Sequence, residues 1–156
     1  MLAILDQRDP QMAEQIYQLQ QVAYTIERDL IDYPDFPPLS VTAHDIQQEE
    51  ETFLGFWVDG QLAGVLSFTL SPDLLDIGRL IVHPTYFRRG VATQLLIAVE
   101  RHAAAGVQLT VSTAEKNLPA VRLYQKHGYQ LTERTLLSDG LVLVRFYKER
   151  RVQTRG

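Results

Sequence analysis

The segment from residue 82 to residue 92, with the sequence VHPTYFRRGVA, constrains the fold more than any other part of the chain. It joins a strand-like run of aliphatic residues, predicted over residues 74–82, to a helix with apolar side chains at helical spacing. The first backbone N–H groups of a helix are unpaired, and the helix dipole favours an anion beside them. Gly90, preceded by Arg88 and Arg89, therefore predicts a turn that binds a phosphate or pyrophosphate.

Composition excludes several classes of function. The chain has 156 residues, 46% of them hydrophobic and 22% charged, which indicates one globular domain over residues 1–156. A net charge of −4 gives no general affinity for nucleic acid. There is no cysteine, which excludes disulfides, a thiolate nucleophile and thiolate metal sites. No apolar run is long enough to span a membrane and no secretory leader is present, so we expect a cytoplasmic protein that does not bind membranes.

The periodicity of the chain predicts an α/β domain in which a mixed sheet carries helices on its faces. A proline-rich segment, residues 32–38, is expected to be a stiff loop, and residues 148–156 a polar tail that frays. The expected order is β-α-α-β-β-β-α-β-α-β-β. The strands are residues 2–5, 53–58, 62–70, 74–82, 108–113, 129–136 and 141–147, and the helices are residues 10–31, 42–50, 90–106 and 117–128.

Residues 82–92 and a second segment, residues 117–129 with the sequence NLPAVRLYQKHGY, together resemble the GNAT superfamily of acetyl-CoA-dependent N-acetyltransferases. The resemblance covers residues 52–147, and the N-terminal part agrees by topology. It implies the GNAT fold, an α/β (α+β) domain with a mixed, mostly antiparallel central sheet. It also implies transfer of an acetyl group from acetyl-CoA to a primary amine of a small molecule or peptide, by direct attack in a ternary complex.

The same resemblance places the acetyl-CoA site. The main chain at the end of the third central strand would meet the acetyl and pantetheine groups, and the turn that follows would hold the pyrophosphate. The family usually has Gln or Arg where this chain has Phe87, so pyrophosphate binding should depend on the backbone and the two arginines. The implied cofactor-binding residues are Leu80, Ile81, Val82, Arg88, Arg89, Gly90, Val91, Ala92, Thr93 and Asn117.

For catalysis, the resemblance makes Tyr124 the general acid that reprotonates the CoA thiolate. The general base is open, because Ser112 stands where some members have a glutamate. We take Asp76 as the first candidate, since strand alternation predicts that it shares a face with Leu80 and Val82. The alternatives are Glu115, Asp35 and a chain of water molecules.

The proline-rich loop is the expected acceptor region. Tyr33 and Asp35 would offer an aromatic wall and a carboxylate to a cationic amine, although the loop is equally well explained as a rigid connector. The four histidines show no ligand spacing, so no metal is predicted. Family members often pair through C-terminal strands, which leaves a homodimer open. The alternative functions are an inactive CoA-binding sensor and an acetyltransferase for protein N-termini or lysines.

Overall fold

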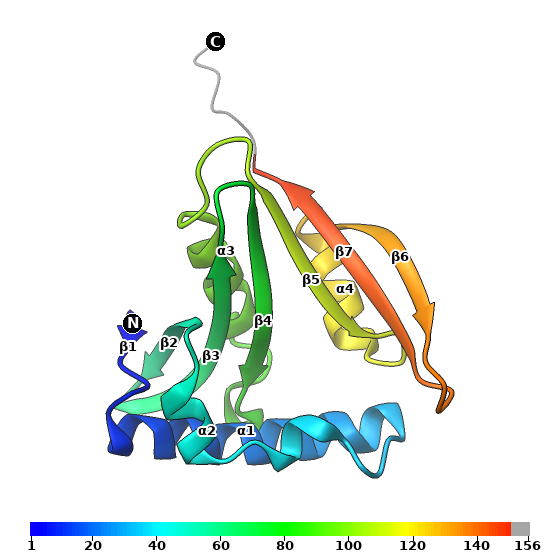
Figure 1. The fold of residues 1–156 in the computed structure, drawn as a ribbon. Helices are drawn as coiled ribbons and strands as arrows, with labels where there is room; N and C mark the ends of the chain where they lie inside the picture. The colour runs from blue at the N-terminus through cyan, green and yellow to red at the C-terminus, as the bar shows by residue number, and fades with distance from the viewer. Residues whose placement is uncertain (151–156) are drawn as a thin grey trace.

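The computed structural model describes residues 1–150, which form a seven-stranded sheet with helices packed on both faces (Figure 1). The elements follow the predicted order. The strands are β1 (Leu2–Leu5), β2 (Thr52–Val58), β3 (Gln61–Leu70), β4 (Leu74–Val82), β5 (Gln108–Ala114), β6 (Gln130–Leu136) and β7 (Val142–Glu149). The helices are α1 (Pro10–Ile31), α2 (Ala43–Gln48), α3 (Val91–Glu100) and α4 (Leu118–Lys126), with short 3-10 helices η1 (Pro37–Ser40) and η2 (Pro84–Tyr86).

The sheet is mixed and mostly antiparallel, as predicted. Its strand order is β1-β2-β3-β4-β5-β7-β6, so β7 lies between β5 and β6. Only β4 and β5 are parallel. Parallel neighbours need a crossover connection, and α3 supplies it. The crossover puts the turn that opens α3 beside the C-terminal end of β4.

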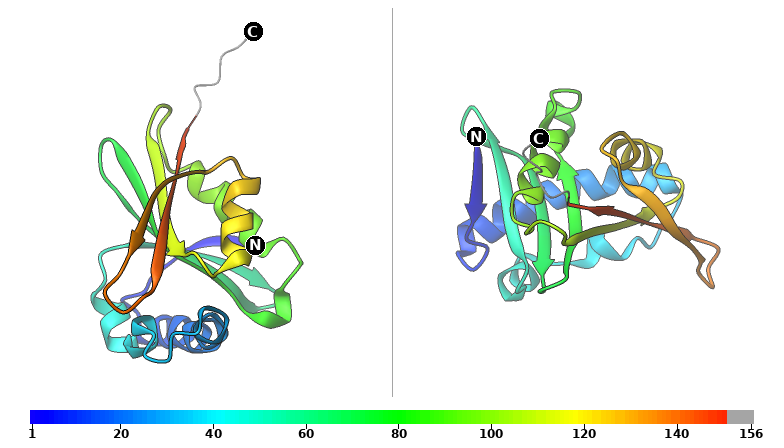
Figure 2. Two further views of the ribbon diagram at one scale, coloured as in Figure 1. Left: turned by 90° about the vertical axis from the view of Figure 1, so that its right-hand side faces the viewer. Right: turned by 90° about the horizontal axis from the view of Figure 1, so that it is seen from above.

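Two hydrophobic cores form, one on each face of the sheet. Figure 2 shows the helices that cover these two faces. On one face, Ile16 of α1 and Ile46 of α2 pack against Phe53. On the other, Leu95 of α3 packs with Phe146 and the buried side of α4. These five named side chains are essentially inaccessible to solvent. Burial of each such side chain stabilises the fold by about 1.5–3 kcal/mol, so both helical layers are held by packing.

A β-bulge in β4 corrects one sequence prediction. The register with β3 pairs Ser67 with Arg79 and then Phe68 with Ile77, so Gly78 is an extra residue in β4. An extra residue reverses the alternation of side chains beyond it. Asp76 therefore does not share a face with Leu80 and Val82, which pack with the α3 core.

Some boundaries also differ from the predictions. The proline-rich segment contains a 3-10 turn at Pro37–Ser40, because proline presets the φ of a first helical turn. The predicted tail begins too early: β7 runs to Glu149, where Lys148 forms an ion pair with Glu100 at 2.9 Å. The rest of that prediction, residues 151–156, lies outside the described residues. Within residues 1–150, no helix is both long and apolar enough to cross a bilayer.

Candidate active site

The site lies where β4 and β5 separate. They pair only from Leu74 and Gln108 to Ile77 and Val111, and beyond these residues the strands diverge. Figure 1 shows the resulting V, with α1 crossing its open end. The second half of β4 therefore has a hydrogen-bonded neighbour on one edge only.

The unpaired edge presents main-chain groups of Leu80 and Val82. The N–H of His83 donates to the carbonyl of Ala63 at 2.8 Å, which fixes the hydrogen-bonding phase of β3 and β4. Residues of an antiparallel pair point their main-chain groups alternately toward and away from the partner strand. In the register of Val65 with Ile81, the N–H and C=O groups of Leu80 and Val82 consequently point away from β3 and into the V.

The turn into α3 supplies further unpaired donors. Arg88 and Gly90 both have positive φ, 64° and 75°, which turns the chain sharply before Val91. No side chain of residues 1–150 caps the start of α3. Its first N–H groups are therefore free to bind an anion, and the helix dipole favours one.

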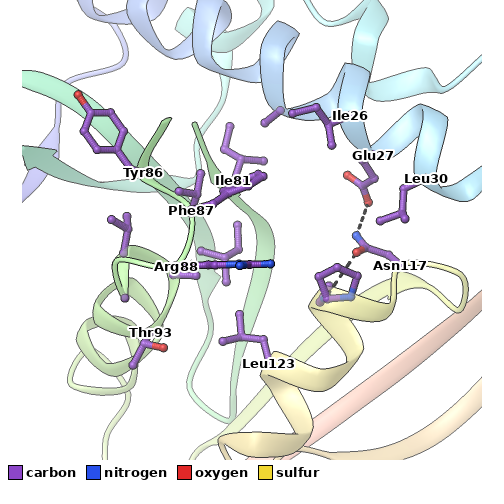
Figure 3. Close-up of a pocket in the computed structure, with 18 of the residues that line it drawn as sticks. Ile26, Glu27, Leu30, Ile81, Tyr86, Phe87, Arg88, Thr93, Asn117 and Leu123 are labelled. Atoms are coloured by element: carbon purple, nitrogen blue, oxygen red, sulfur yellow. Dashed lines mark hydrogen bonds between the residues drawn. The ribbon is translucent and has the colours of Figure 1, made fainter. Parts of the chain in front are cut away.

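A cavity of about 600 Å³ joins these features (Figure 3). Phe87 lines it and is 49% exposed, so it presents an apolar surface where the family usually has a polar side chain. Arg89 is the one predicted cofactor residue outside the lining, and its guanidinium lies over the ring of Tyr86 at 5.7 Å. The other nine line the cavity: Leu80, Ile81, Val82, Arg88, Gly90, Val91, Ala92, Thr93 and Asn117.

Glu27, which was not among the predicted site residues, enters the cavity from α1 (Figure 3). Its Oε1 accepts a hydrogen bond from Asn117 Nδ2 at 3.0 Å. Burial raises the pKa of the Glu27 carboxyl above its ordinary value, and the bond from Asn117 lowers it in part. The sequence does contain a signal for Glu27. Gln20 and Glu27 are polar residues on the face of α1 that otherwise carries Ile16 and Ala23 into the core.

Asn117 has two structural roles. Its Oδ1 accepts the N–H of Ala120 at 3.3 Å and so caps α4, while its amide N–H binds Glu27. The cap fixes the side chain at the rim of the cavity, and the bond to Glu27 ties α4 to α1 across the V. Asn117 therefore orients the carboxylate as well as starting the helix.

Tyr124 lies in the cavity wall and is only 4% exposed. Its ring packs against Tyr129 and Phe146, with centroids 5.8 and 5.9 Å away. Burial raises its pKa far above the ordinary value, and the nearby Glu27 carboxylate and Tyr24 phenol raise it further. The phenol is thus protonated at neutral pH.

The other predicted catalytic and acceptor residues lie outside this cavity. Asp76 accepts a hydrogen bond from Thr110 Oγ1 at 2.7 Å, and Asp35 is not part of the lining. Tyr33 donates to Asp139 in the turn between β6 and β7, which ties the proline-rich loop to that hairpin. These three assignments stay predictions that the geometry does not support. Among residues 1–150, no cluster of three acidic or histidine side chains could hold a metal ion.

A family model described as "Acetyltransferase (GNAT) family" matches residues 13–129. The chain belongs to the GNAT acetyltransferase family. It is also 36% identical over 155 residues to the UPF0157 protein YqkA of Bacillus subtilis (strain 168). That alignment covers 98% of this chain but only 45% of YqkA, so the chain spans less than half the length of this relative.

Solved GNAT structures share the fold. The ribosomal-protein-S18-alanine N-acetyltransferase from Escherichia coli superimposes with a TM-score of 0.74 at 17% identity, covering 100% of this chain and 97% of that enzyme. An aminoglycoside 6'-N-acetyltransferase in complex with coenzyme A superimposes with a TM-score of 0.74 at 13% identity, covering 99% of each chain. At these identities the similarity establishes the architecture. It assigns no acceptor, since the two neighbours act on different molecules.

Proposed function

We propose that this protein transfers an acetyl group from acetyl-CoA to a primary amine by direct attack within a ternary complex. One observation carries the proposal: a single cavity brings together Glu27, Tyr124, the free main chain of Leu80 and Val82, and the uncapped start of α3. Acetyl-CoA supplies an activated carbonyl carbon and a thiolate leaving group. We assign the residues of the cavity to the groups that react: the amine, the carbonyl and the leaving thiol.

Glu27 is proposed as the general base. An alkylammonium has a pKa of about 10 and must lose a proton before its nitrogen can attack. The raised pKa of Glu27 makes this carboxylate a better proton acceptor than an exposed one. The bond from Asn117 fixes its orientation and leaves the second carboxylate oxygen for the ammonium group.

The remaining groups act on the carbonyl and on the leaving thiol. When the C–N bond forms, negative charge gathers on the acetyl oxygen, and a main-chain N–H of Leu80 or Val82 can stabilise it. The C–S bond then breaks, Tyr124 donates its proton to the thiolate, and the second proton leaving the new amide nitrogen restores the phenol. The unpaired N–H groups of Val91 and Ala92, with the Arg88 guanidinium, suit the pyrophosphate.

Thiol release from acetyl-CoA, measured over a panel of small amines and short peptides, tests the proposal. We expect turnover with at least one amine and initial-rate lines that intersect, as a ternary complex requires. Turnover confined to peptides would favour acetylation of protein N-termini or lysines. Calorimetric binding of CoA with no turnover on any acceptor would reject the proposed reaction and favour a sensor.

A further inference from the structure

Helix α1 presents a mostly apolar surface to the active-site cavity. Its residues in the lining are Ala23, Ile26, Glu27 and Leu30, whose spacing of three and four residues places them on one face of the helix. Glu27 is the single polar residue among these four. The proposed base therefore lies within an apolar wall formed by Ala23, Ile26 and Leu30.

Two side chains of this wall are open to a ligand. Ile26 is 39% exposed and Leu30 is 46% exposed, whereas Ile16, which packs on the sheet from the same helix, is buried. Figure 3 shows Ile26, Glu27 and Leu30 together on α1, and Thr93 of the cofactor turn across the cavity from them. A ligand that covers exposed apolar side chains gains affinity in proportion to the area removed from water.

The charges of the lining suit an acceptor with one cationic group. Among residues 1–150, the charged side chains of the lining are Glu27 and Arg88, one of each sign. Asp35 and Asp76 lie outside it, so the described part of the cavity offers no second carboxylate to a second ammonium group. A polyamine would place that group against apolar side chains, which is unfavourable.

The geometry of α1 brings the substituent of the amine onto the wall. Asn117 holds one oxygen of Glu27 at 3.0 Å, which leaves the other oxygen for the ammonium group. Leu30 follows Glu27 by three residues, or about 4.5 Å along the helix axis, and Ile26 adjoins Glu27 in the sequence. The first few carbon atoms beyond the nitrogen are therefore within reach of both apolar side chains.

We propose that the acceptor is a primary amine with a single charge and an apolar alkyl or arylalkyl substituent, and that Ile26 and Leu30 bind this substituent. This inference rests on the proposed function, because it takes Glu27 as the group that meets the amine. Neither Ile26 nor Leu30 can transfer a proton, so both would set the choice of acceptor and leave the chemistry to Glu27.

Titration calorimetry on the CoA-loaded protein measures acceptor binding where no acetyl group can be transferred. The probes are n-alkylamines from ethylamine to octylamine, and diamines of matching length. Each methylene group that the wall covers should raise the affinity about fourfold, until the chain extends beyond the wall. A diamine as long as the tightest alkylamine should bind at least about tenfold more weakly, because its second ammonium group must leave water.

Substitutions on α1 identify the wall. Ile26→Ser and Leu30→Ser should each lower the gain per methylene to about twofold or less, with ethylamine binding nearly unchanged. Val22→Ser is the matched control, because Val22 is 38% exposed on the same helix and lies outside the lining. Its alkylamine series should match that of the wild type. If one wall variant fails to fold, the other variant and the wild-type comparison of alkylamine with diamine decide the question.

The outcomes separate the two proposals. A flat alkylamine series, equal affinities of alkylamine and diamine, or an unchanged gain per methylene in both wall variants would overturn this inference, even if the enzyme turns over amines. Tighter binding of longer acyl-CoA molecules through Ile26 and Leu30, with no gain from longer amines, would also overturn it and assign the wall to the acyl group. A steep series that depends on both side chains, in a protein with no turnover on any amine, would retain the apolar site and reject the acetyltransferase proposal.

Discussion

Replacement of Glu27 by glutamine is the most direct test of the proposed chemistry. Glu27→Gln keeps an oxygen that can accept the hydrogen bond from Asn117 Nδ2, so the contact between α1 and α4 should persist. The amide cannot take a proton from the acceptor. The substitution therefore removes the base and leaves the shape of the cavity nearly unchanged.

The expected loss follows from the pKa of the acceptor. At pH 7, about one alkylamine molecule in 10³ is unprotonated when its pKa is about 10. Without a base, only this fraction can attack, so kcat/KM should fall by about 10²–10³, within the range measured for general bases. The deficit should shrink about tenfold per pH unit as the pH approaches the pKa of the amine.

The assay is thiol release at saturating acetyl-CoA from about pH 6 to about pH 10, the range that brackets the acceptor's titration. The wild-type acidic limb should reflect the raised pKa of Glu27, and the limb of the variant should move to the pKa of the amine. A Glu27→Gln enzyme that keeps its kcat/KM at pH 7 within a few fold would refute Glu27 as the base.

Stability gives an independent check on the same carboxyl. Because its pKa is raised in the folded state, its contribution to stability is present at low pH and is lost as the pH rises through the folded pKa. At neutral pH the buried carboxylate is therefore unfavourable, and Glu27→Gln should have a Tm equal to or above that of the wild type. A lower Tm would contradict the burial argument.

Three further predictions concern the acid, the cofactor turn and the ion-pair cluster. Tyr124→Phe should lower kcat by about tenfold or more with little change in acetyl-CoA affinity, since only the proton donor is removed; an unchanged kcat would exclude Tyr124 as the acid. Gly90→Glu should weaken CoA binding in calorimetry more than Gly90→Ala does. Both variants strain a backbone of φ 75°, by about 1–2 kcal/mol, but only glutamate repels the pyrophosphate, so equal affinities would refute the anion site. Burial raises the pKa of Glu49 to about 7, so the wild-type Tm should decline as the pH rises from about 4.5 through 7. Glu49→Gln should flatten that decline while exposed Glu50→Gln should not, as thermal unfolding across pH would reveal.

Much of the cofactor site could be predicted because its residues are close together in the sequence. The strand, the turn at Gly90 and the start of α3 lie within one short segment, and their backbone conformations depend on local residue types. Asn117 and Tyr124 lie on one short helix with a recognisable cap. Nine of the ten predicted cofactor residues line the cavity for this reason, and Arg89 lies outside the lining because a turn does not fix where each side chain points.

The sequence by itself determined the order of elements, which follows from local periodicity and turn chemistry, and it identified the family through the resemblance of two motifs. Only the tertiary structure decided which carboxylate enters the cavity. Glu27 reaches Asn117 across 90 residues because α1 crosses the open V, and the bulge at Gly78 removes Asp76 from the face it was predicted to share. The burial of Gln20 beside Arg79 likewise appears only when α1 packs on β4. Long-range packing sets the neighbours and the burial of a polar group, and these decide whether it acts on a ligand or stabilises the core.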